Sequence, residues 1–544
     1  MMNVTLPSLR ALVLGAVSLG SLALVAQESK VRWKVSTNFD APPDEGTCYA
    51  KVVKGDGGCF VGLRVKGSST VLGGLNQVDI DRTLEAFALE GLTKIKFDKT
   101  KILWGEGPVT VETIERFASQ FRVFATKADP ERAKLLLIQQ VLSPRSLTGK
   151  GAQLLAEIPF DRLGKGADYF KPNVITGFTS TVGVDSTKLL IGLTPQSTTR
   201  SAGCPVFAQV FDKQMKLLWT NTLTVDANAR TIDIIDTKVD GSGAVWYLIK
   251  NITNPEPKTK EDLGYSFSLY RLDSTGQQAV LLDLAGKDYA QDITMDMKVD
   301  GSMVFAGVYG GEGTNRNESI GAYRCVFDAK AMKFDGFKLM PFEKRLEKIA
   351  GSPSAAKVEK WQINMKIGRV MWKKNGGVFI VAAKSGIETH YVADLSGKKT
   401  AKTEQVDGAL HIFELDATGE QKWYKQIDRM LGYDNDVPGR VIAACYDDAL
   451  FVMINDNDGN FEKRKLKEPV QEITSMKDAV LFEFKPNGEE KGKVVMIDGF
   501  KQRGLQASQV WRISPGLIIT TGSEGFGKDR SWPVIFTMSN EVKK

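Results

Sequence analysis

A short run of carboxylate and amide side chains between Asn455 and Asn460 could bind a metal ion. Clustered oxygen ligands of this kind suit a hard cation such as calcium. The run departs from an EF-hand loop, because Ile454 stands where the first ligand belongs and Lys465 stands where a bidentate glutamate is required. Two interpretations stay open, a polar turn and an irregular calcium site at Asp456 and Asp458. Calcium is the one cofactor that the sequence suggests.

The chain contains only two histidines, His390 and His411. A metal site built from several histidines is therefore excluded within one chain, and a serine-histidine-aspartate relay would have to use one of these two. His411 begins a predicted strand at a repeated position, which favours a structural role. His390, beside Tyr391 in a predicted long loop, is the better binding candidate, although most loop histidines are simply solvated.

The distribution of basic residues does not favour a phosphate site or a nucleic-acid-binding surface. The densest basic run, Lys463 to Lys467, is bracketed by Glu462 and Glu468, as is typical of a solvated loop. The net charge is only +7 over 544 residues, and Lys and Glu are interspersed. A nucleic-acid binder would concentrate its basic residues on one face. We therefore expect no nucleic-acid partner.

The secondary structure that positions these residues is indicated by a recurring sequence motif. In this motif an alternating apolar run is followed by an acidic residue and a turn. Its fullest copy contains Asp416, Gly419 and Trp423, and shorter copies end at Asp212, Asp273 and Asp328. Alternation buries one side chain in two, and an Asp with Gly three residues later favours a tight turn. Such a unit cannot bury its face alone, so recurrence predicts stacked units.

Two kinds of turn can be counted independently. Lys-Val-Asp-Gly-Ser begins at Lys238 and again at Lys298, and Asp-Gly between apolar runs is a strong hairpin signal. With weaker equivalents, such as that at Asp129, there are eight inner hairpins. The polar residues that end each third strand also number eight: Glu90, Asp161, Asp212, Asp273, Asp328, Asp416, Lys485 and Ser539.

Two hairpins per unit form the four-stranded antiparallel blade of a β-propeller. We therefore predict an all-β fold, a single propeller in residues 27–544 with eight blades, or seven as the alternative. Short helical insertions are expected near 111–120 and 342–360. Only five residues follow Ser539, too few for a fourth strand. The segment around Trp33 resembles the fourth strand around Trp423, so the N-terminal strand should complete the last blade and close the ring.

Residues 1–26 have the composition of an export signal. They contain one basic residue, Arg10, followed by a mostly apolar stretch that ends at Ala26, and no acids. No cysteine precedes Cys48, so no lipid anchor is expected, and no later apolar run reaches the ~18 residues of a membrane span. The mature protein is thus expected in the periplasm or outside the cell, without a transmembrane segment.

The five cysteines do not predict a disulfide framework. Hairpin register places Cys48 about six residues along the strand from Cys59, beyond the ~7 Å Cα limit for a bridge. Cys325 occupies the apolar position held by Phe413 and Tyr270 in other copies, which favours a buried thiol. We expect at most one disulfide.

The Asp-x-x-Gly-x-x-x-Trp motif at Asp416, Gly419 and Trp423 resembles the repeat of the quinoprotein-type, or PQQ-like, eight-bladed propellers. That family includes quinone-dependent dehydrogenases and non-enzymatic scaffolds such as the outer-membrane assembly lipoprotein of the Bam complex. The resemblance implies an eight-bladed ring. The dehydrogenases carry adjacent cysteines beside the quinone and the scaffold carries a lipid-anchoring cysteine; this chain has neither, so neither role is transferred.

The connections between second and third strands are predicted to be long and to emerge on one face, where binding residues concentrate. The leading hypothesis is a non-enzymatic binding or scaffold module for a protein or polysaccharide partner. The alternative is a carboxylate-based glycan hydrolase or lyase, which needs no histidine. The predicted contact residues on the long-loop face are Arg316, His390, Tyr391, Asp458, Arg464, Arg530 and Trp532.

Overall fold

The computed structural model is built almost entirely from antiparallel strands. It describes residues 31–36, 47–54, 59–72, 75–88, 99–100, 103–104, 107–144, 147–149, 151–163, 177–194, 205–225, 231–254, 263–284, 286, 288–311, 318–342, 349–350, 362–363, 365–393, 399–429, 431–433, 441–456, 458–468, 470–471, 478–495, 503–514, 516–524 and 531–540. The predicted export signal lies outside these residues.

Most strands belong to sheets of four, each named here by its first strand. The β2 sheet contains β2 (Thr47–Lys54), β3 (Cys59–Leu72), β4 (Leu75–Ala88) and β5 (Lys99–Thr100). The β8 sheet contains β8 (Thr110–Phe117), β9 (Gln120–Asp129), β10 (Lys134–Leu142) and β11 (Gln153–Pro159). The β12 sheet contains β12 (Gly177–Val182), β13 (Lys188–Thr194), β14 (Pro205–Asp212) and β15 (Leu217–Thr224).

The middle of the chain continues in the same way. The β16 sheet contains β16 (Thr231–Val239), β17 (Val245–Ile252), β18 (Tyr265–Asp273) and β19 (Gly276–Leu281). The β20 sheet contains β20 (Tyr289–Met297), β21 (Met303–Gly310), β23 (Gly321–Asp328) and β24 (Lys333–Pro341). The β27 sheet contains β27 (Met365–Trp372), β28 (Val378–Ala393), β29 (Lys399–Leu415) and β30 (Gln421–Ile427), with β31 (Leu431–Tyr433) as a fifth strand beside β29.

The last two sheets contain the C-terminal strands of the chain. The β32 sheet contains β32 (Ile442–Tyr446), β33 (Ala449–Asp456), β35 (Asp478–Phe484) and β36 (Glu490–Val495). The β37 sheet contains β37 (Arg503–Ser514), β38 (Leu517–Glu524), β39 (Ser531–Asn540) and β1 (Val31–Ser36).

Short elements decorate the connections. Three two-stranded pairs join β6 (Leu103–Trp104) to β7 (Gly107–Pro108), β22 (Glu318–Ser319) to β26 (Gln362–Ile363), and β25 (Ile349–Ala350) to β34 (Val470–Gln471). The helices within the described residues are the 3-10 helix η1 (Phe160–Leu163) and α1 (Asp458–Lys465). No helix in this part of the chain is long and apolar enough to cross a membrane.

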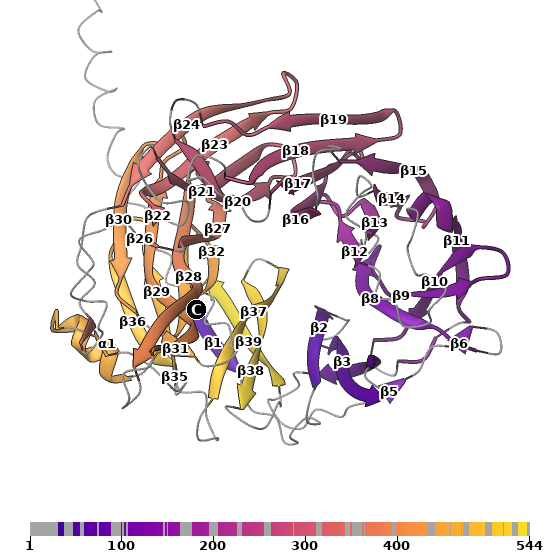
Figure 1. The fold of residues 1–544 in the computed structure, drawn as a ribbon, viewed down its shortest axis with the longest axis horizontal. Coiled ribbons are helices and arrows are strands. Elements are labelled where there is room, and N and C mark those ends of the chain that lie inside the picture. Colours follow the sequence, from indigo (N-terminus) through magenta and orange to yellow (C-terminus); the bar gives the residue numbers. More distant parts are fainter. Residues whose placement is uncertain are drawn as a thin grey trace, which may run out of the picture.

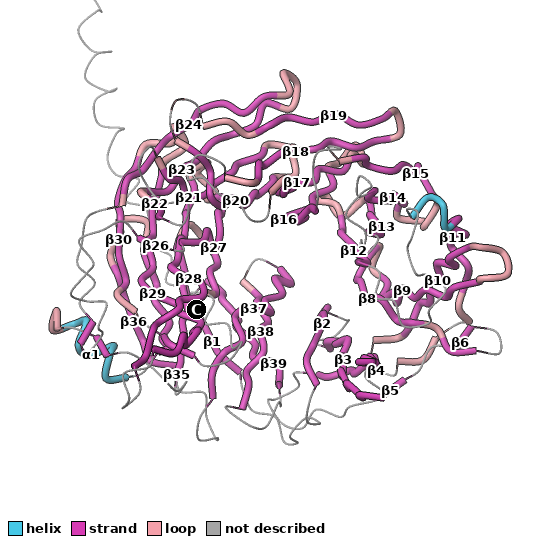
Figure 2. Tube along the Cα trace, viewed as in Figure 1, coloured by secondary structure: helices cyan, strands magenta, loops and turns pink. Residues whose placement is uncertain are grey.

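The sheets stand side by side around a ring, with their first strands toward its middle (Figure 1). The same view coloured by secondary structure shows mostly strands, in magenta, and few helical turns (Figure 2). Apart from the addition of β1 to the β37 sheet, the sheets of four are up-and-down meanders of neighbouring strands. Repeated four-stranded meanders arranged radially define a β-propeller. The predicted all-β propeller fold is confirmed at this level.

The N-terminal strand pairs with the last strand of the chain, as predicted. In the β37 sheet, β1 runs antiparallel to β39, with Trp33 opposite Met538 and Val35 opposite Phe536. β1 thereby supplies the fourth strand of the β37 sheet. The pairing covers an edge that would otherwise offer unpaired backbone groups.

The structure corrects the reading of the β8 sheet. Residues 111–120, predicted as a helix, form β8 and the turn into β9. The Asp129 turn, predicted as an inner hairpin, therefore joins the second and third strands, and Asp161 lies in η1 beyond the fourth strand. The second predicted helical insertion, 342–360, lies largely outside the described residues, which here include strand β25.

The predicted long loop from 384 to 408 is also corrected. The second and third strands of the β27 sheet continue through it as a hairpin, in which His390 lies opposite Lys402 and Tyr391 lies opposite Ala401. Strand β31 pairs with the base of this extension, Leu431 opposite Asp407. The connection between the second and third strands, predicted as a long loop, is thus an extension of the two strands themselves.

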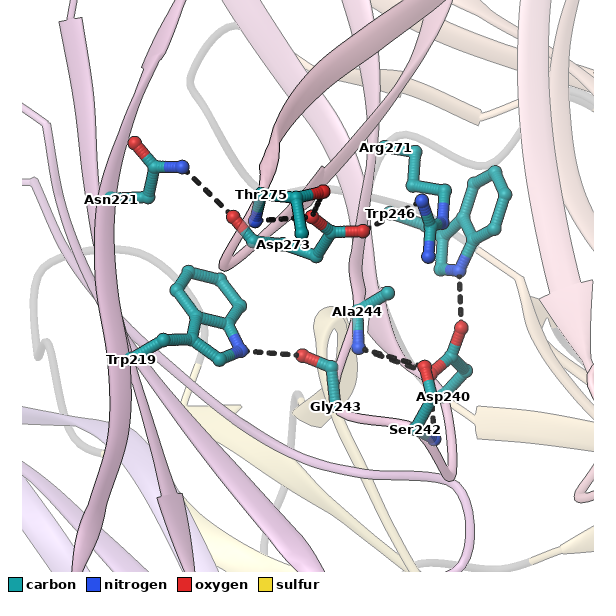
Figure 3. Close-up of polar contacts among 10 residues, drawn as sticks. All are labelled: Trp219, Asn221, Asp240, Ser242, Gly243, Ala244, Trp246, Arg271, Asp273 and Thr275. Carbon is teal, nitrogen blue, oxygen red and sulfur yellow. Dashed lines mark hydrogen bonds and ion pairs between the residues drawn. The ribbon is translucent and has the colours of Figure 1, made fainter.

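The repeated Asp organises its turn and helps to join neighbouring sheets (Figure 3). Oδ1 of Asp240 accepts hydrogen bonds from the backbone N–H groups of Ser242 (2.9 Å) and Ala244 (3.1 Å). Gly243 follows with a positive φ of 88°, a conformation that favours glycine. From the preceding sheet, Nε1 of Trp219 donates to the Gly243 carbonyl at 3.2 Å. The turn motif thus stabilises its own hairpin and also provides the hydrogen-bond acceptor for a tryptophan of the neighbouring sheet.

The cores lie between adjacent sheets. One cluster joins Trp246 and Leu269 of the β16 sheet to Phe305 and Cys325 of the β20 sheet. Cys325 is a free, fully buried thiol, as predicted, and burial raises its pKa. Cys48 lies opposite Val65 in the β2–β3 register, six positions from Cys59, which confirms the predicted separation of these cysteines.

Candidate functional site

Most of the predicted contact residues cannot be compared as side chains. Arg316 and Arg530 lie outside the described residues. Strand positions are described for His390 and Tyr391 in β28 and for Trp532 in β39, and Asp458 begins α1. In register, Trp532 lies opposite Gly522, at the connection between second and third strands. Their role in binding stays a prediction.

Arg464 is described in full and is held inside the fold. α1 carries it against the wholly buried Asp456 at the end of β33, and the two form an ion pair. Nε of Arg464 also donates to the Asp428 carbonyl at 2.8 Å. The basic run predicted as a solvated loop is therefore partly a helix with a structural arginine.

The side-chain amide of Asn460 also contributes to the contact between α1 and the end of β33. Its Nδ2 donates to Oδ1 of Asp456 at 3.1 Å and to the Gln471 carbonyl at 2.8 Å, and its Oδ1 accepts from the Gln471 N–H at 2.7 Å. A calcium ion at Asp456 would have to compete with the Arg464 guanidinium. Within the described residues, no group of three or more His, Cys, Asp or Glu side chains could hold a metal ion. Calcium at Asp456 and Asp458 stays a prediction.

His411 is a core residue. It is fully buried in β29, its Nδ1 lies 2.6 Å from the Tyr424 hydroxyl, and its ring packs at a tilt against Phe342, with centroids 4.5 Å apart. Burial lowers the pKa of His411 to about 3. The imidazole is therefore neutral at physiological pH, in agreement with the predicted structural role.

The most regular unpredicted feature is a β-bulge on the innermost strands. Pairing with the second strand skips one residue directly before Lys51, Thr113, Asp236, Asp292 and Arg369, in β2, β8, β16, β20 and β27. A bulge adds one residue to one strand and so re-aims the side chains that follow it. The strands that carry these bulges border the centre of the ring (Figure 1).

Buried side chains hold the bulge of β20 in place. The Tyr323 hydroxyl donates to the carbonyl of Asp292 at 3.2 Å, crossing Gly307 on the intervening strand. A Cβ at Gly307 would come within 2.0 Å of that carbonyl oxygen. Glycine is required there because any side chain would displace either the bulge or the tyrosine ring.

On one side of the ring, charged side chains link three innermost strands. Lys51 of β2 forms an ion pair with Glu115 of β8 and donates to the Ser180 hydroxyl of β12 at 3.1 Å. The Ser180 hydroxyl donates in turn to Glu115 at 2.5 Å. Because the carboxylate and the ammonium satisfy each other, this group serves chiefly to join neighbouring sheets.

On the other side lies a group that we call the central cluster, made of Asp236, Lys238, Asp296, Arg369 and Arg512. It draws side chains from β16, β20, β27 and β37. Lys238 forms an ion pair with Asp236 at 3.0 Å. Arg369 interacts electrostatically with both aspartates, and Arg512 with Arg369 and Asp296. Five ionisable groups from four sheets thus share one small region.

The electrostatics of the central cluster are those of a poorly hydrated site. Burial raises the pKa of Asp296, while Lys238 and Arg369 oppose the shift. Burial lowers the pKa of Arg369 and of Arg512, and the neighbouring guanidinium of Arg369 lowers that of Arg512 further. Arg512 is nevertheless exposed over the residue as a whole.

A second polar group lies at the other end of β20. Asp292 accepts a hydrogen bond from the Ile367 N–H at 2.9 Å, which satisfies an edge amide of β27. Burial raises its pKa, and the nearby Lys366 and Lys250 oppose the shift. Nζ of Lys250 lies 4.0 Å from the ring centroid of Tyr265. Carboxylates of β20 therefore help to hold the next inner strand.

Sequence reasoning did not find the central cluster. Its signal was present as charged residues near the start of units, Asp233, Asp236 and Lys238 before one hairpin and Asp292 and Asp296 before the next. Simple alternation assigns Asp233 and Asp236 to opposite faces. The bulge between Ile234 and Asp236 brings them back to the same side.

The fold and this polar centre define the chain as a β-propeller protein. No family model and no curated protein matches it. Among solved structures it is similar to the β-propeller domain of the Trilobed protease from Pyrococcus furiosus, with 11% identity and a TM-score of 0.32, covering 82% of this chain and 95% of that one.

Two further likenesses are of the same strength. Prolyl oligopeptidase B from Galerina marginata gives 9% identity and a TM-score of 0.38, covering 88% of this chain and 55% of that one. The polysaccharide lyase Uly1 gives 9% identity and a TM-score of 0.34, covering 83% and 93%. At these values the likenesses carry no argument about function.

Proposed function

We propose that the protein is an exported, non-enzymatic β-propeller that binds a protein or glycan partner and acts as a binding or scaffold module. The repeated bulge is the observation that supports this function. It recurs on the innermost strands of five sheets, each time directly before a polar or charged residue, while the turns and ion pairs hold the sheets together. A rigid ring that presents charged side chains from several blades is suited to recognition.

The ring itself is proposed to have eight blades closed by β1, related to the PQQ-like repeat. The supporting motif is the turn at Asp416, whose Oδ1 accepts from the Thr418 N–H at 2.9 Å and from the Glu420 N–H at 3.0 Å. Gly419 has a φ of 87°, and Trp423 packs against Gly488 of the next sheet. Residues 1–26 are proposed to direct export to the periplasm or the exterior.

Enzymatic glycan cleavage is the second candidate, because the raised pKa values of Asp292 and Asp296 are a property of general acids. Their placement argues against it. They lie four residues apart on β20, a Cα separation of roughly 13 Å at 3.3 Å per residue. Paired catalytic carboxylates of glycosidases lie about 5 to 9.5 Å apart. Both aspartates also accept backbone hydrogen bonds from the neighbouring strand.

Partner capture from the native cell envelope would test the binding function. Mature protein is immobilised and bound material is identified, and then alanine variants are compared. Substitutions at the predicted contact residues on strand connections should weaken capture: Arg316, His390, Tyr391, Asp458, Arg530 and Trp532. Thr275→Ala and Ser242→Ala, in the short turns on the other face, are the matched controls and should leave capture unchanged.

Two outcomes would contradict the proposal. Capture that depends on the short turns and not on the connections would place the interface on the wrong face. Cleavage of an envelope glycan by the wild type but not by Asp292→Asn or Asp296→Asn would establish the enzymatic alternative.

A further inference from the structure

The guanidinium of Arg369 has donors without acceptors. Its Nε is inaccessible to solvent and forms no hydrogen bond in the described part of the chain. Asp236 and Asp296 attract it electrostatically, but neither is hydrogen-bonded to it. A buried donor without a partner is costly, and in a native protein it calls for an explanation.

The carboxylates nearby are already engaged. Asp236 accepts from the Thr237 N–H at 2.8 Å and pairs with Lys238. Asp296 accepts from the Met297 N–H at 3.0 Å and lies 3.4 Å from the Trp372 N–H. Each carboxylate of the central cluster therefore already accepts hydrogen bonds, whereas Nε of Arg369 has no acceptor in the described structure. A ligand with an acceptor group would satisfy this donor.

Arg512 provides a second set of donors. Its Nη2 donates to the Ala443 carbonyl of β32 at 2.7 Å, which anchors the side chain. Arg512 is exposed over the residue as a whole, so it is open to a ligand. Arg369 and Arg512 repel each other, so an anion between or beside them would relieve that repulsion. Three cationic side chains also face two carboxylates in the central cluster.

We propose that Arg369 and Arg512 form a binding site for an oxyanionic group, a carboxylate, sulfate or phosphate, on the ligand of this propeller. The planar fork of arginine matches such groups through paired N–H donors. Lys238 adds positive charge while remaining paired with Asp236. The inference rests on the proposed binding function and adds to it the chemistry of the bound group.

The test uses the full mature protein and small probes: sodium glucuronate, acetate, sulfate and phosphate, each titrated by calorimetry at low ionic strength. At least one probe should bind, and the preferred one identifies the oxyanion. Arg369→Gln and Arg512→Gln should each weaken binding about tenfold or more, as expected for loss of a charge-assisted hydrogen bond. Lys333→Gln, which removes a positive charge at the exposed Lys333–Asp335 pair on the outer strand β24, should bind as the wild type does.

Unchanged affinity in both arginine variants, or no binding of any probe up to about 10 mM, would overturn the proposal. If Arg369→Gln does not fold, Arg512→Gln decides, because Arg512 is the more exposed of the two residues. Partner capture is measured in parallel. Capture that depends on the strand connections, combined with no oxyanion binding, would reject this site and leave the proposed function standing.

Discussion

Acidification should destabilise the protein through His411. The imidazole is fully buried, it contacts the Tyr424 hydroxyl through Nδ1 at 2.6 Å, and its Nε2 has no hydrogen-bond partner in the described structure. Burial lowers its pKa from 6.5 to about 3. An imidazolium there would lose its hydration without gaining a carboxylate partner.

The sign follows from which state binds the proton. Below pH 6.5 this histidine is protonated in the unfolded state but not in the folded state. The free energy of unfolding therefore decreases as the pH is lowered, down to about pH 3. Each pH unit inside that window changes the unfolding equilibrium about tenfold. Between pH 6 and pH 4 the contribution of this one residue is therefore roughly hundredfold.

Urea unfolding at a series of pH values from 7.5 to 4 measures the effect. His411→Phe keeps an aromatic ring between Phe342 and Tyr424 but cannot titrate. Its stability should fall less steeply with acidification than that of the wild type. Tyr424→Phe keeps the histidine and should keep the slope. Other titrating groups are common to all three proteins and cancel in the comparison. Parallel curves for wild type and His411→Phe would refute the reasoning.

Three further predictions concern stability and redox state. Glu414→Gln leaves the ammonium of Lys373, 2% exposed, without its carboxylate and should cost about 3–5 kcal/mol in urea unfolding; Lys373→Met with Glu414→Leu should recover most of it. Deletion of residues 27–37 removes β1 from β39 and should lower the thermal unfolding temperature and promote aggregation; an unchanged temperature would contradict closure by β1. Denaturing, non-reducing thiol titration should find at least three free thiols among the five cysteines; a count of one would disprove the prediction.

The parts of the fold that were predictable depend on local turn chemistry. An Asp that caps its own turn, followed by Gly at positive φ, leaves a signal within a few residues, as at Asp240 with Gly243 and at Asp416 with Gly419. The pairing of β1 with β39 was also predictable, because a count of strands left one missing at the C-terminus.

The helix predicted at 111–120 shows where local patterns mislead. A bulge between Val111 and Thr113 places Val111 and Ile114 on the same side of β8, and both pack in one core cluster. Apolar residues three apart on one face imitate helical spacing. Register shifts of this kind are set by the neighbouring strand, and so they cannot be read from one segment.

The central cluster could not be predicted for a related reason. Arg369 and Arg512 belong to strands far apart in the sequence, and each looks like an ordinary charged residue in its own segment. Likewise, Arg464 looked available for a partner until α1 placed it on buried Asp456. In both cases long-range pairing decides whether a charge is structural or free for a ligand.

The bulges separate two requirements that an inner strand of a propeller must meet. After the bulge of β20, Ile293 and Met295 pack into the core between sheets, while Asp292 and Asp296 alternate with them on the other side. Core packing therefore constrains one set of residues and the ring centre another. Charges at the centre can change without disturbing the contacts between sheets, provided that edge amides such as that of Ile367 keep an acceptor. Ligand specificity in such a ring would then depend on few positions, the polar residues of the innermost strands.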